Sequence, residues 1–239
     1  MTSYHGGKNR IGKAIAEVIY DIATDIEEND DFVIKGYCEP FAGMLGVYQH
    51  IPKLFDGHKP KLKYLAGDAN ASTIKMWQAA QKGWKPPVRK VSRTEFMKLK
   101  GNGKSSPEKG YIGHLYGYMG KYFQPFDGRT TVRQRQRTSE KVMSIADELK
   151  SVKFTAGNYT QFSKLRNYII YADPPYQIQN YYYGESDDRR SFDTAMFFEW
   201  CQKMAKHNIV FVSEYSAPKD FSKVWTDKKK GGKEKLYLY

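Results

Sequence analysis

The chain has few of the residues that build metal sites and disulfide frameworks. Its 239 residues include two cysteines, Cys38 and Cys201, which lie far apart in the sequence. The five histidines, at positions 5, 50, 58, 114 and 207, show none of the spacings typical of metal ligands. We therefore expect neither a disulfide-stapled fold nor a metal site, and we expect any chemistry to be metal-free at the protein level.

Long apolar runs are also lacking. No stretch approaches the roughly 18 apolar residues that a membrane-spanning helix needs. The first ten residues, MTSYHGGKNR, do not contain the apolar segment of a secretory signal peptide. We expect a cytoplasmic protein.

Acidic residues are scarce relative to basic ones. The chain has 39 Lys and Arg against 26 Asp and Glu, which gives a formal net charge of +13. Such an excess predicts a polyanionic partner, either nucleic acid or an anionic membrane surface. Between positions 82 and 137 there are 14 Lys and Arg against three acids, so this region is the candidate contact surface.

Alternating strand and helix patterns predict an α/β fold with a mostly parallel sheet that is covered by helices on both faces. The predicted helices are 10–26, 71–81 and 192–206, and the predicted strands are 32–39, 64–68, 168–172, 209–213 and 235–239.

This rhythm fails between 83 and 150, where Gly, Pro, Lys and Tyr are frequent and only 139–150 has a clear helical pattern. We interpret 83–150 as an insertion into a domain made of 1–82 and 151–239. A second lysine-rich stretch, 219–235, is interpreted as a solvated loop.

The stretch YIIYADPPY, residues 168–176, is the most informative local pattern. Proline donates no ladder hydrogen bond and fixes φ near −65°, so the buried strand has to stop at Asp173. In open α/β sheets, ligands bind beyond the carboxyl ends of the strands. The alternative is an ordinary tight turn that leaves a core strand.

Two further patterns follow predicted strands. Gly43 and Gly46 in CEPFAGMLGV open a turn whose backbone a ligand could approach closely, although such a glycine pair also occurs in ordinary turns. Asp68 lies 25 residues after Gly43, close to the spacing at which nucleotide-binding folds place an acid on the ribose hydroxyls. It could also be the N-cap of the helix that follows.

Taken in order, the segments YHGGK, EPFAGMLGV, GDAN, a basic insertion and YADPPY resemble the alpha class of Dam-like DNA adenine methyltransferases. The resemblance implies a Rossmann-like methyltransferase fold with a twisted, mostly parallel sheet. It also implies an enzyme that uses S-adenosylmethionine, releases S-adenosylhomocysteine and needs no metal. The implied partner is double-stranded DNA, with no membrane and no obligate protein partner.

The resemblance also implies site residues. Residues 38–47 would line the cofactor site through Glu39, Pro40, Phe41 and Gly43, and Asp68 would bind the ribose. The remaining cofactor contacts would be Tyr4 and Lys8 near the methionine part, Asn158 in place of the usual acid near the adenine, and Asp173.

The motif Asp-Pro-Pro-Tyr suits methylation of an exocyclic amine, whose lone pair is delocalised into the ring. Asp173 and the Pro174 carbonyl would accept the two N–H bonds and aim the lone pair at the methyl group. Pro175 would help to hold this carbonyl outward, because neither proline offers an N–H. Tyr176 would stack on a base that has left the duplex.

The insertion would read the DNA. Its segment 120–137 resembles the part of Dam-like enzymes that forms a recognition hairpin, and on a strand Arg133, Arg135 and Arg137 would share one face. These arginines could bind guanine or phosphate. The complete set of expected DNA contacts is Lys121, Tyr122, Arg129, Arg133, Arg135 and Arg137.

Three alternatives remain open at this point. The chain could be an RNA adenine methyltransferase, it could methylate the 4-amino group of cytosine, or it could be a DNA-binding relative that has lost catalysis.

Overall fold

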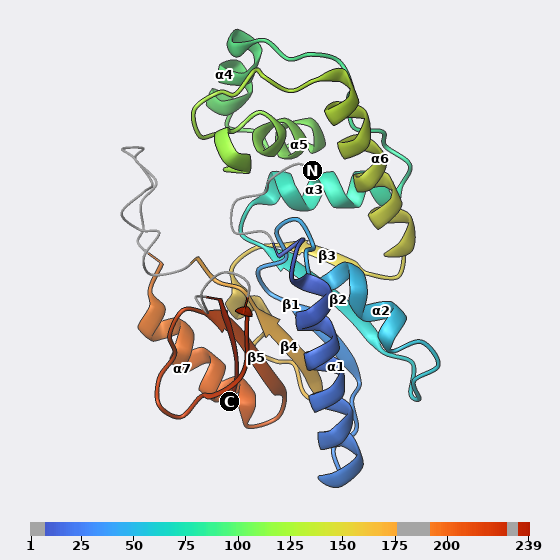
Figure 1. Cartoon of the computed structure of the whole chain (residues 1–239), viewed down its shortest axis with the longest axis vertical. Helices are drawn as coiled ribbons and strands as arrows, with labels where there is room; N and C mark the ends of the chain where they lie inside the picture. Colours follow the sequence, from blue (N-terminus) through green and yellow to red (C-terminus); the bar gives the residue numbers. More distant parts are fainter. Residues whose placement is uncertain (1–7, 176–191, 229–233) are drawn as a thin grey trace.

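The computed structural model describes residues 8–175, 192–228 and 234–239, and it contains one seven-stranded sheet with the strand order β3-β2-β1-β4-β5-β7-β6 (Figure 1). The strands are β1 Gly36–Glu39, β2 Lys63–Asp68, β3 Lys153–Ala156, β4 Tyr168–Ala172, β5 Ile209–Glu214, β6 Ser222–Thr226 and β7 Lys235–Leu238.

The first five strands of this order are parallel to one another, and β7 is antiparallel to both β5 and β6. The expected α/β fold with a mostly parallel, Rossmann-like sheet is therefore confirmed. The predicted strand at 235–239 is present as β7. The interpretation of 219–235 as a loop is wrong for Ser222–Thr226, because these residues pair with β7. Between β1 and β4 the strand order reverses, which is where such sheets bind ligands.

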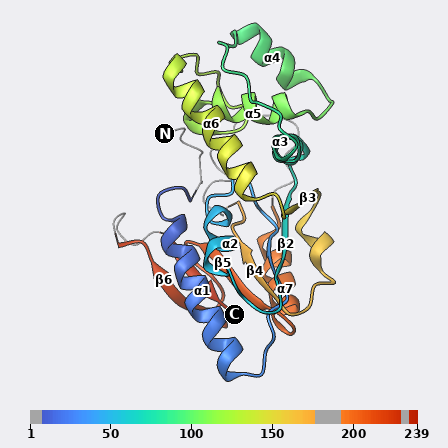
Figure 2. The same ribbon diagram turned by 90° about the vertical axis from the view of Figure 1, so that its right-hand side faces the viewer.

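Helices cover the two faces of the sheet because successive strand residues point to opposite sides. Helix α1, Gly12–Asn29, buries Ile15 and Ile19 in the same core cluster as Tyr171 of β4. Helix α7, Thr194–Ala205, packs Phe197 against the opposite face, in the cluster that contains the alternate β4 residues. Figure 2 shows the sheet between these two helices.

Short elements follow β1 and β3, and a longer helix follows β2. Residues Tyr48–His50 and Ile51–Leu54 form the 3-10 helix η1 and helix α2, and Tyr159–Phe162 form η3. Helix α3 spans Ala71–Gln81, as predicted. Its N-cap is Asn70, whose side chain accepts hydrogen bonds from Ser72 and Thr73, so the alternative of Asp68 as the cap is wrong.

The insertion is helical, which corrects the expectation of largely irregular structure. It contains α4 Arg93–Gly101, α5 Pro107–Leu115, the 3-10 turn η2 Tyr118–Gly120 and α6 Val132–Glu148. Each α-helix has a side-chain cap at its start, namely Ser92, Ser106 and Thr131. We call α4, α5, α6 and their connections, 93–148, the helical unit.

The helical unit lies on α3, on the side away from the body of the sheet (Figure 1). Helix α5 approaches α3 so closely that a Cβ on Gly110 would lie 2.2 Å from the Ser72 carbonyl oxygen. Ser139 on α6 donates to the Pro86 carbonyl, which holds the segment that leads from α3 into the unit. The domain boundaries near 82 and 150 remain a prediction. No helix in the described parts of the chain is long and apolar enough to cross a bilayer.

Candidate active site

Charged side chains meet where β1 and β4 end, at the reversal of strand order. The Lys8 ammonium lies 2.7 Å from Asp173 Oδ1 and 3.0 Å from Glu234 Oε1. Lys8 is 5% exposed, and the two carboxylates are 20% and 17% exposed. Burial lowers the pKa of Lys8, but Asp173 and Glu234 outweigh this effect and raise the pKa above its usual value. Lys8 is therefore held as a cation.

Two further acids lie at the same edge of the sheet. Glu39 ends β1 and accepts a hydrogen bond of 2.7 Å from the Tyr37 hydroxyl, and burial raises its pKa well above the usual range. Glu214 ends β5 and accepts from the Tyr215 backbone N–H at 2.7 Å. Its pKa is raised to about 7, first by burial and then by the charges of Asp173 and Glu234. The edge thus combines one buried ammonium with several carboxyl groups.

Asp68 organises the glycine turn after β1. Its Oδ2 accepts the Gly43 N–H at 2.9 Å and its Oδ1 accepts the Asn70 N–H at 2.8 Å. Gly43 has a φ of 45°, which favours glycine, and its carbonyl accepts the Trp77 indole N–H at 3.0 Å. Burial raises the pKa of Asp68, although these two backbone hydrogen bonds oppose the shift. Asp68 therefore joins the turn to the start of α3.

The predicted cofactor residues form a row along the carboxyl edge. Asn158 follows β3, is exposed, and caps η3 by accepting the Thr160 N–H at 3.0 Å. Next along the edge come Asp68 at the end of β2, and then Pro40 and Phe41 after β1. Phe41 is partly exposed and packs against Tyr159, with 5.5 Å between the ring centroids.

These groups fit a nucleoside-bearing cofactor. A carboxylate accepts up to about four hydrogen bonds, so Asp68 can bind two backbone N–H groups and ribose hydroxyls together. The exposed amide of Asn158 and the partly exposed ring of Phe41 lie on either side of it along the edge. In the described residues, no group of three or more His, Cys, Asp or Glu side chains is placed to hold a metal ion.

The structure places part of the Asp-Pro-Pro-Tyr motif. Strand β4 ends at Ala172, Asp173 follows it, Pro174 is buried and Pro175 is exposed. Tyr176 and Tyr4 lie outside the described residues. The assigned roles of all these residues remain predictions.

The arginine-rich segment differs from the expectation. Arg133, Arg135 and Arg137 lie on helix α6 and not on a strand, so they do not share one face. Arg135 is 6% exposed, and it donates from Nε to the Val88 carbonyl at 2.7 Å and from Nη1 to the Thr130 carbonyl at 2.6 Å. Its guanidinium therefore links the segment that contains Val88 to the segment that contains Thr130. Arg133 and Arg137 are exposed and four residues apart, on one side of the helix.

The other predicted DNA contacts lie in the connection between α5 and α6. Arg129 is exposed and pairs with Asp127 at 2.8 Å, which lowers the pKa of Asp127 to about 2. Lys121 is partly exposed. Tyr122 is also partly buried, and its ring packs on His114 with centroids 4.8 Å apart. Tyr122 therefore has a packing role in this structure.

The same connection forms a hairpin-like turn that carries two exposed apolar side chains. A bridge pairs Gly117 with Phe126, and the Tyr118 N–H donates to the Pro125 carbonyl at 2.9 Å. At the tip, Tyr118 is 48% and Met119 is 53% exposed. Neither residue is among the contacts predicted from the sequence. Two large apolar residues between glycines in a basic region could have indicated an exposed turn.

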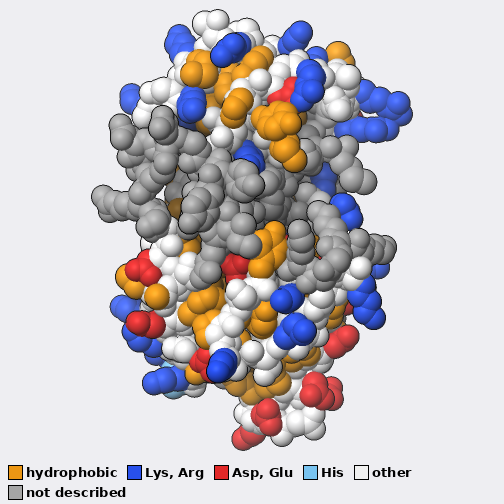
Figure 3. All heavy atoms as spheres, turned by 60° about the vertical axis from the view of Figure 1, so that its left-hand side comes forward, with side chains coloured by type: hydrophobic (Ala, Val, Ile, Leu, Met, Phe, Trp, Pro, Cys, Tyr) orange, Lys and Arg blue, Asp and Glu red, His pale blue; other side chains and the backbone are white. Residues whose placement is uncertain are grey.

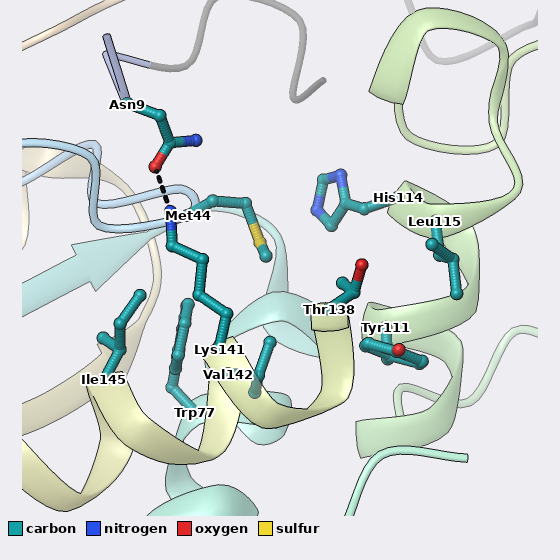
Figure 4. A pocket seen from close by; sticks show the side chains of 10 residues that line it. All are labelled: Asn9, Met44, Trp77, Tyr111, His114, Leu115, Thr138, Lys141, Val142 and Ile145. Atoms are coloured by element: carbon teal, nitrogen blue, oxygen red, sulfur yellow. Dashed lines mark hydrogen bonds between the residues drawn. The ribbon is translucent and has the colours of Figure 1, made fainter. Parts of the chain in front are cut away.

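A pocket lies between the helical unit and the glycine turn (Figure 4). Its empty volume is about 500 Å³, including space open to solvent. Met44 contributes from the glycine turn, Trp77 from α3 and Val142 from α6. Lys141 of α6 donates to Asn9 Oδ1 at 3.0 Å (Figure 4). The ion group, which consists of Lys8, Asp173 and Glu234, does not line this pocket.

Basic side chains gather on the helical unit and on the segment that leads into it. Figure 3 shows Lys and Arg side chains around the upper end of the molecule, with apolar side chains among them and acidic ones at the opposite end. The exposed basic residues there are Lys82, Lys85, Arg89, Lys90, Arg93, Lys98, Lys100, Lys104, Arg129, Arg133, Arg137 and Lys141.

Comparison with known proteins points to one family. The model of the D12 class N6 adenine-specific DNA methyltransferase family matches residues 111–237, just over half of the chain. A search of curated proteins returns no significant match.

Among solved structures, the rRNA methyltransferase aviRa from Streptomyces viridochromogenes is 10% identical with a TM-score of 0.43, and the alignment covers 95% of this chain and 83% of that one. SMU.472, which carries a provisional assignment as a methyltransferase and is complexed with SAH, is 9% identical with a TM-score of 0.35, over 98% of this chain and 54% of that one. Both likenesses are distant. The family match includes Asp173 and the two prolines after it, and the chain therefore belongs to the D12 class of N6 adenine-specific DNA methyltransferases.

Proposed function

We propose that this adenine methyltransferase acts on double-stranded DNA and transfers a methyl group from S-adenosylmethionine to the N6 amino group of a flipped adenine. The observation that carries the proposal is the position of Asp173. It follows β4 at the reversal of strand order, and Lys8 holds it at 2.7 Å. Ligand crevices of open α/β sheets occur at this position.

Asp173 and the Pro174 carbonyl are the proposed acceptors for the two N–H bonds of the target amine. A carboxylate can accept the Lys8 ammonium and an amine N–H at once. Acceptors on both N–H bonds favour a nitrogen whose lone pair is localised. The N–C bond would then form as the C–S bond of the sulfonium breaks, and the nitrogen would release one proton to water.

The cofactor would lie along the row of residues at the carboxyl edge, and it supplies the electrophilic methyl group. Asp68 would bind its ribose and Asn158 its adenine, and Phe41 would contribute an apolar surface. The expected roles of Tyr4 beside the methionine part and of Tyr176 on the flipped base complete the proposal.

The helical unit would bind the duplex. Its exposed basic residues suit phosphate contacts, and the exposed Arg133 and Arg137 of α6 could read bases or bind phosphates. Tyr118 and Met119 suit an apolar wedge, because proteins that unstack a base step often insert such side chains.

The test is a transfer assay with S-adenosylmethionine that carries a labelled methyl group. Duplex DNA, single-stranded DNA and RNA are incubated separately with the protein, and the digested nucleosides are separated. We expect labelled N6-methyladenine from duplex DNA, formed about a hundredfold or more slowly by Asp173→Ala. Label on cytosine, or on RNA alone, would contradict the proposal.

A further inference from the structure

Glu234 completes the ion group at Asp173, although it belongs to none of the sequence motifs. Its Oε1 lies 3.0 Å from the Lys8 ammonium, which also lies 2.7 Å from Asp173 Oδ1. We propose that Glu234 is a positioning residue for methyl transfer, which shares Lys8 with Asp173 and so keeps Asp173 a strong acceptor for the target amine. This inference rests on the proposed function.

The topology explains why Glu234 reaches this place. Strand β7 is antiparallel to β5, so β7 begins at the edge where the parallel strands end. Glu234 immediately precedes β7, and its carbonyl accepts the Asp227 N–H at 2.9 Å. In the next position, Lys235 pairs in register with Glu214. The backbone of Glu234 is therefore held by the sheet.

The backbone of Lys8 is equally constrained. Its carbonyl accepts the Ile11 N–H at 3.0 Å at the start of α1. Gly46 approaches so closely that a Cβ there would lie 2.9 Å from the Lys8 backbone nitrogen. Because both backbones are fixed, the Lys8 ammonium is directed to a point between the two carboxylates.

The charged groups that surround Lys8 are acidic. Asp173 after β4 and Glu234 before β7 contact it, and Glu39 of β1, Glu214 of β5 and Tyr215 also interact with it electrostatically. Burial acts to lower the pKa of Lys8, and the two contacting carboxylates act to raise it. Without the Glu234 charge, the pKa of Lys8 falls.

The consequence for the reaction follows from how Lys8 is shared. With Glu234 present, the ammonium divides its hydrogen bonds between two carboxylates. With Glu234→Gln, the ammonium turns more fully to Asp173, whose oxygens then accept the target amine less well. Because one charge-assisted hydrogen bond is redistributed, we expect the single-turnover methylation rate to fall by about ten- to a hundredfold. The KM for DNA should not change, because Glu234 is not proposed to contact DNA.

The pH profile separates this role from a purely structural one. The rate deficit of Glu234→Gln relative to the wild type should shrink as pH rises, because Lys8 loses its proton at lower pH in this variant and then no longer competes for Asp173. Glu234→Asp keeps a carboxylate, so its rate deficit should be smaller and should change less with pH. Glu199→Gln is the matched control, since it removes the same charge from a side chain on α7 that is 65% exposed. It should leave both rate and pH profile unchanged.

A second readout does not depend on methylation. The pH dependence of Lys8 acetylation by an added reagent, followed by mass spectrometry on the protein alone, reports its deprotonation directly. We expect Lys8 to react at lower pH in Glu234→Gln than in the wild type. If the wild type fails to methylate DNA, the proposed function is wrong, while this titration still decides whether Glu234 controls Lys8.

Unchanged Lys8 reactivity together with a wild-type rate in Glu234→Gln overturns the inference. If Glu234→Gln loses its cooperative melting transition, Glu234→Asp decides instead. In that variant the carboxylate is drawn back from Lys8 by one methylene, so acetylation of Lys8 at lower pH than in the wild type supports the role of Glu234, and wild-type Lys8 reactivity with a wild-type rate removes it.

Discussion

Replacing Arg135 with alanine should destabilise the helical unit and should not primarily change DNA recognition. The side chain is 6% exposed, and its guanidinium donates to the Val88 and Thr130 carbonyls at 2.7 and 2.6 Å. Val88 lies in the segment that enters the helical unit, and Thr130 precedes the N-cap of α6. The substitution therefore releases both segments at once.

The two hydrogen bonds set the expected magnitude. A hydrogen bond to a charged group contributes about 1.5–3 kcal/mol, so two of them give an upper limit of about 6 kcal/mol. Water can enter the space left by the side chain and solvate both carbonyls, which reduces the loss. We expect the free energy of unfolding to fall by about 3 kcal/mol. Exposed Arg133 and Arg137 should each change it by less than about 0.5 kcal/mol when replaced by alanine.

Urea unfolding followed by tryptophan fluorescence measures the stability of each variant, and fluorescence anisotropy with duplex DNA at several salt concentrations measures binding. Arg133→Ala and Arg137→Ala should weaken binding, and each lost phosphate contact should reduce the salt slope by about one. Arg135→Ala should unfold at lower urea concentration and retain the salt slope while folded. Wild-type stability combined with a lost salt slope in Arg135→Ala would refute the reasoning.

Three further predictions concern the active site and its surroundings. Asp173→Ala should reduce the single-turnover methylation rate by about a hundredfold or more with little change in DNA affinity, and a parental rate would exclude Asp173 as an acceptor. Tyr118→Ala and Met119→Ala should each weaken the signal of a base analogue that reports unstacking at the target, as expected for a stacking loss of about 1–3 kcal/mol, and unchanged signals would exclude the wedge. The pKa of Glu214 is raised from 4.5 to about 7 in the folded protein, so the wild type should lose stability relative to Glu214→Gln as pH rises through this window. Melting temperatures of the two proteins measured across that window would contradict this if their difference stayed constant.

Five of the seven strands could be predicted because they are short, apolar and bounded by turn residues, whereas β3 and β6 are not among the predicted strands. Residues 168–172 were expected as a strand and form β4 with the same ends, since two prolines stop the ladder there. Helix α3 was also predicted at both ends, because its apolar positions recur with helical spacing. In these segments the local sequence pattern and the tertiary packing favour the same secondary structure.

The composition of the helical unit hides its helices, whereas its capping residues indicate them. Ser106 followed by Pro107, and Thr131 followed three residues later by Gln134, are sequence patterns for helix starts. The alternating arginines of 133–137 suggested a strand, but Thr131 and Gln134 form a capping box that begins α6. No local pattern could predict that Arg135 donates a hydrogen bond to Val88, because Val88 lies 47 residues away.

Only part of the ion group can be predicted from the rule that ligand sites lie at the carboxyl ends of parallel strands. Asp173 and Glu214 lie at the carboxyl edge because they follow or end parallel strands, and this could be read from the sequence. Glu234 obeys a second rule, that a residue before an antiparallel strand lies at the edge where its parallel neighbours end. The strand at 235–239 was predicted without its direction, so this rule could not be applied. Once β7 is known to be antiparallel, Glu234 has to lie near Asp173, and the fixed backbone of Lys8 then places one ammonium between them.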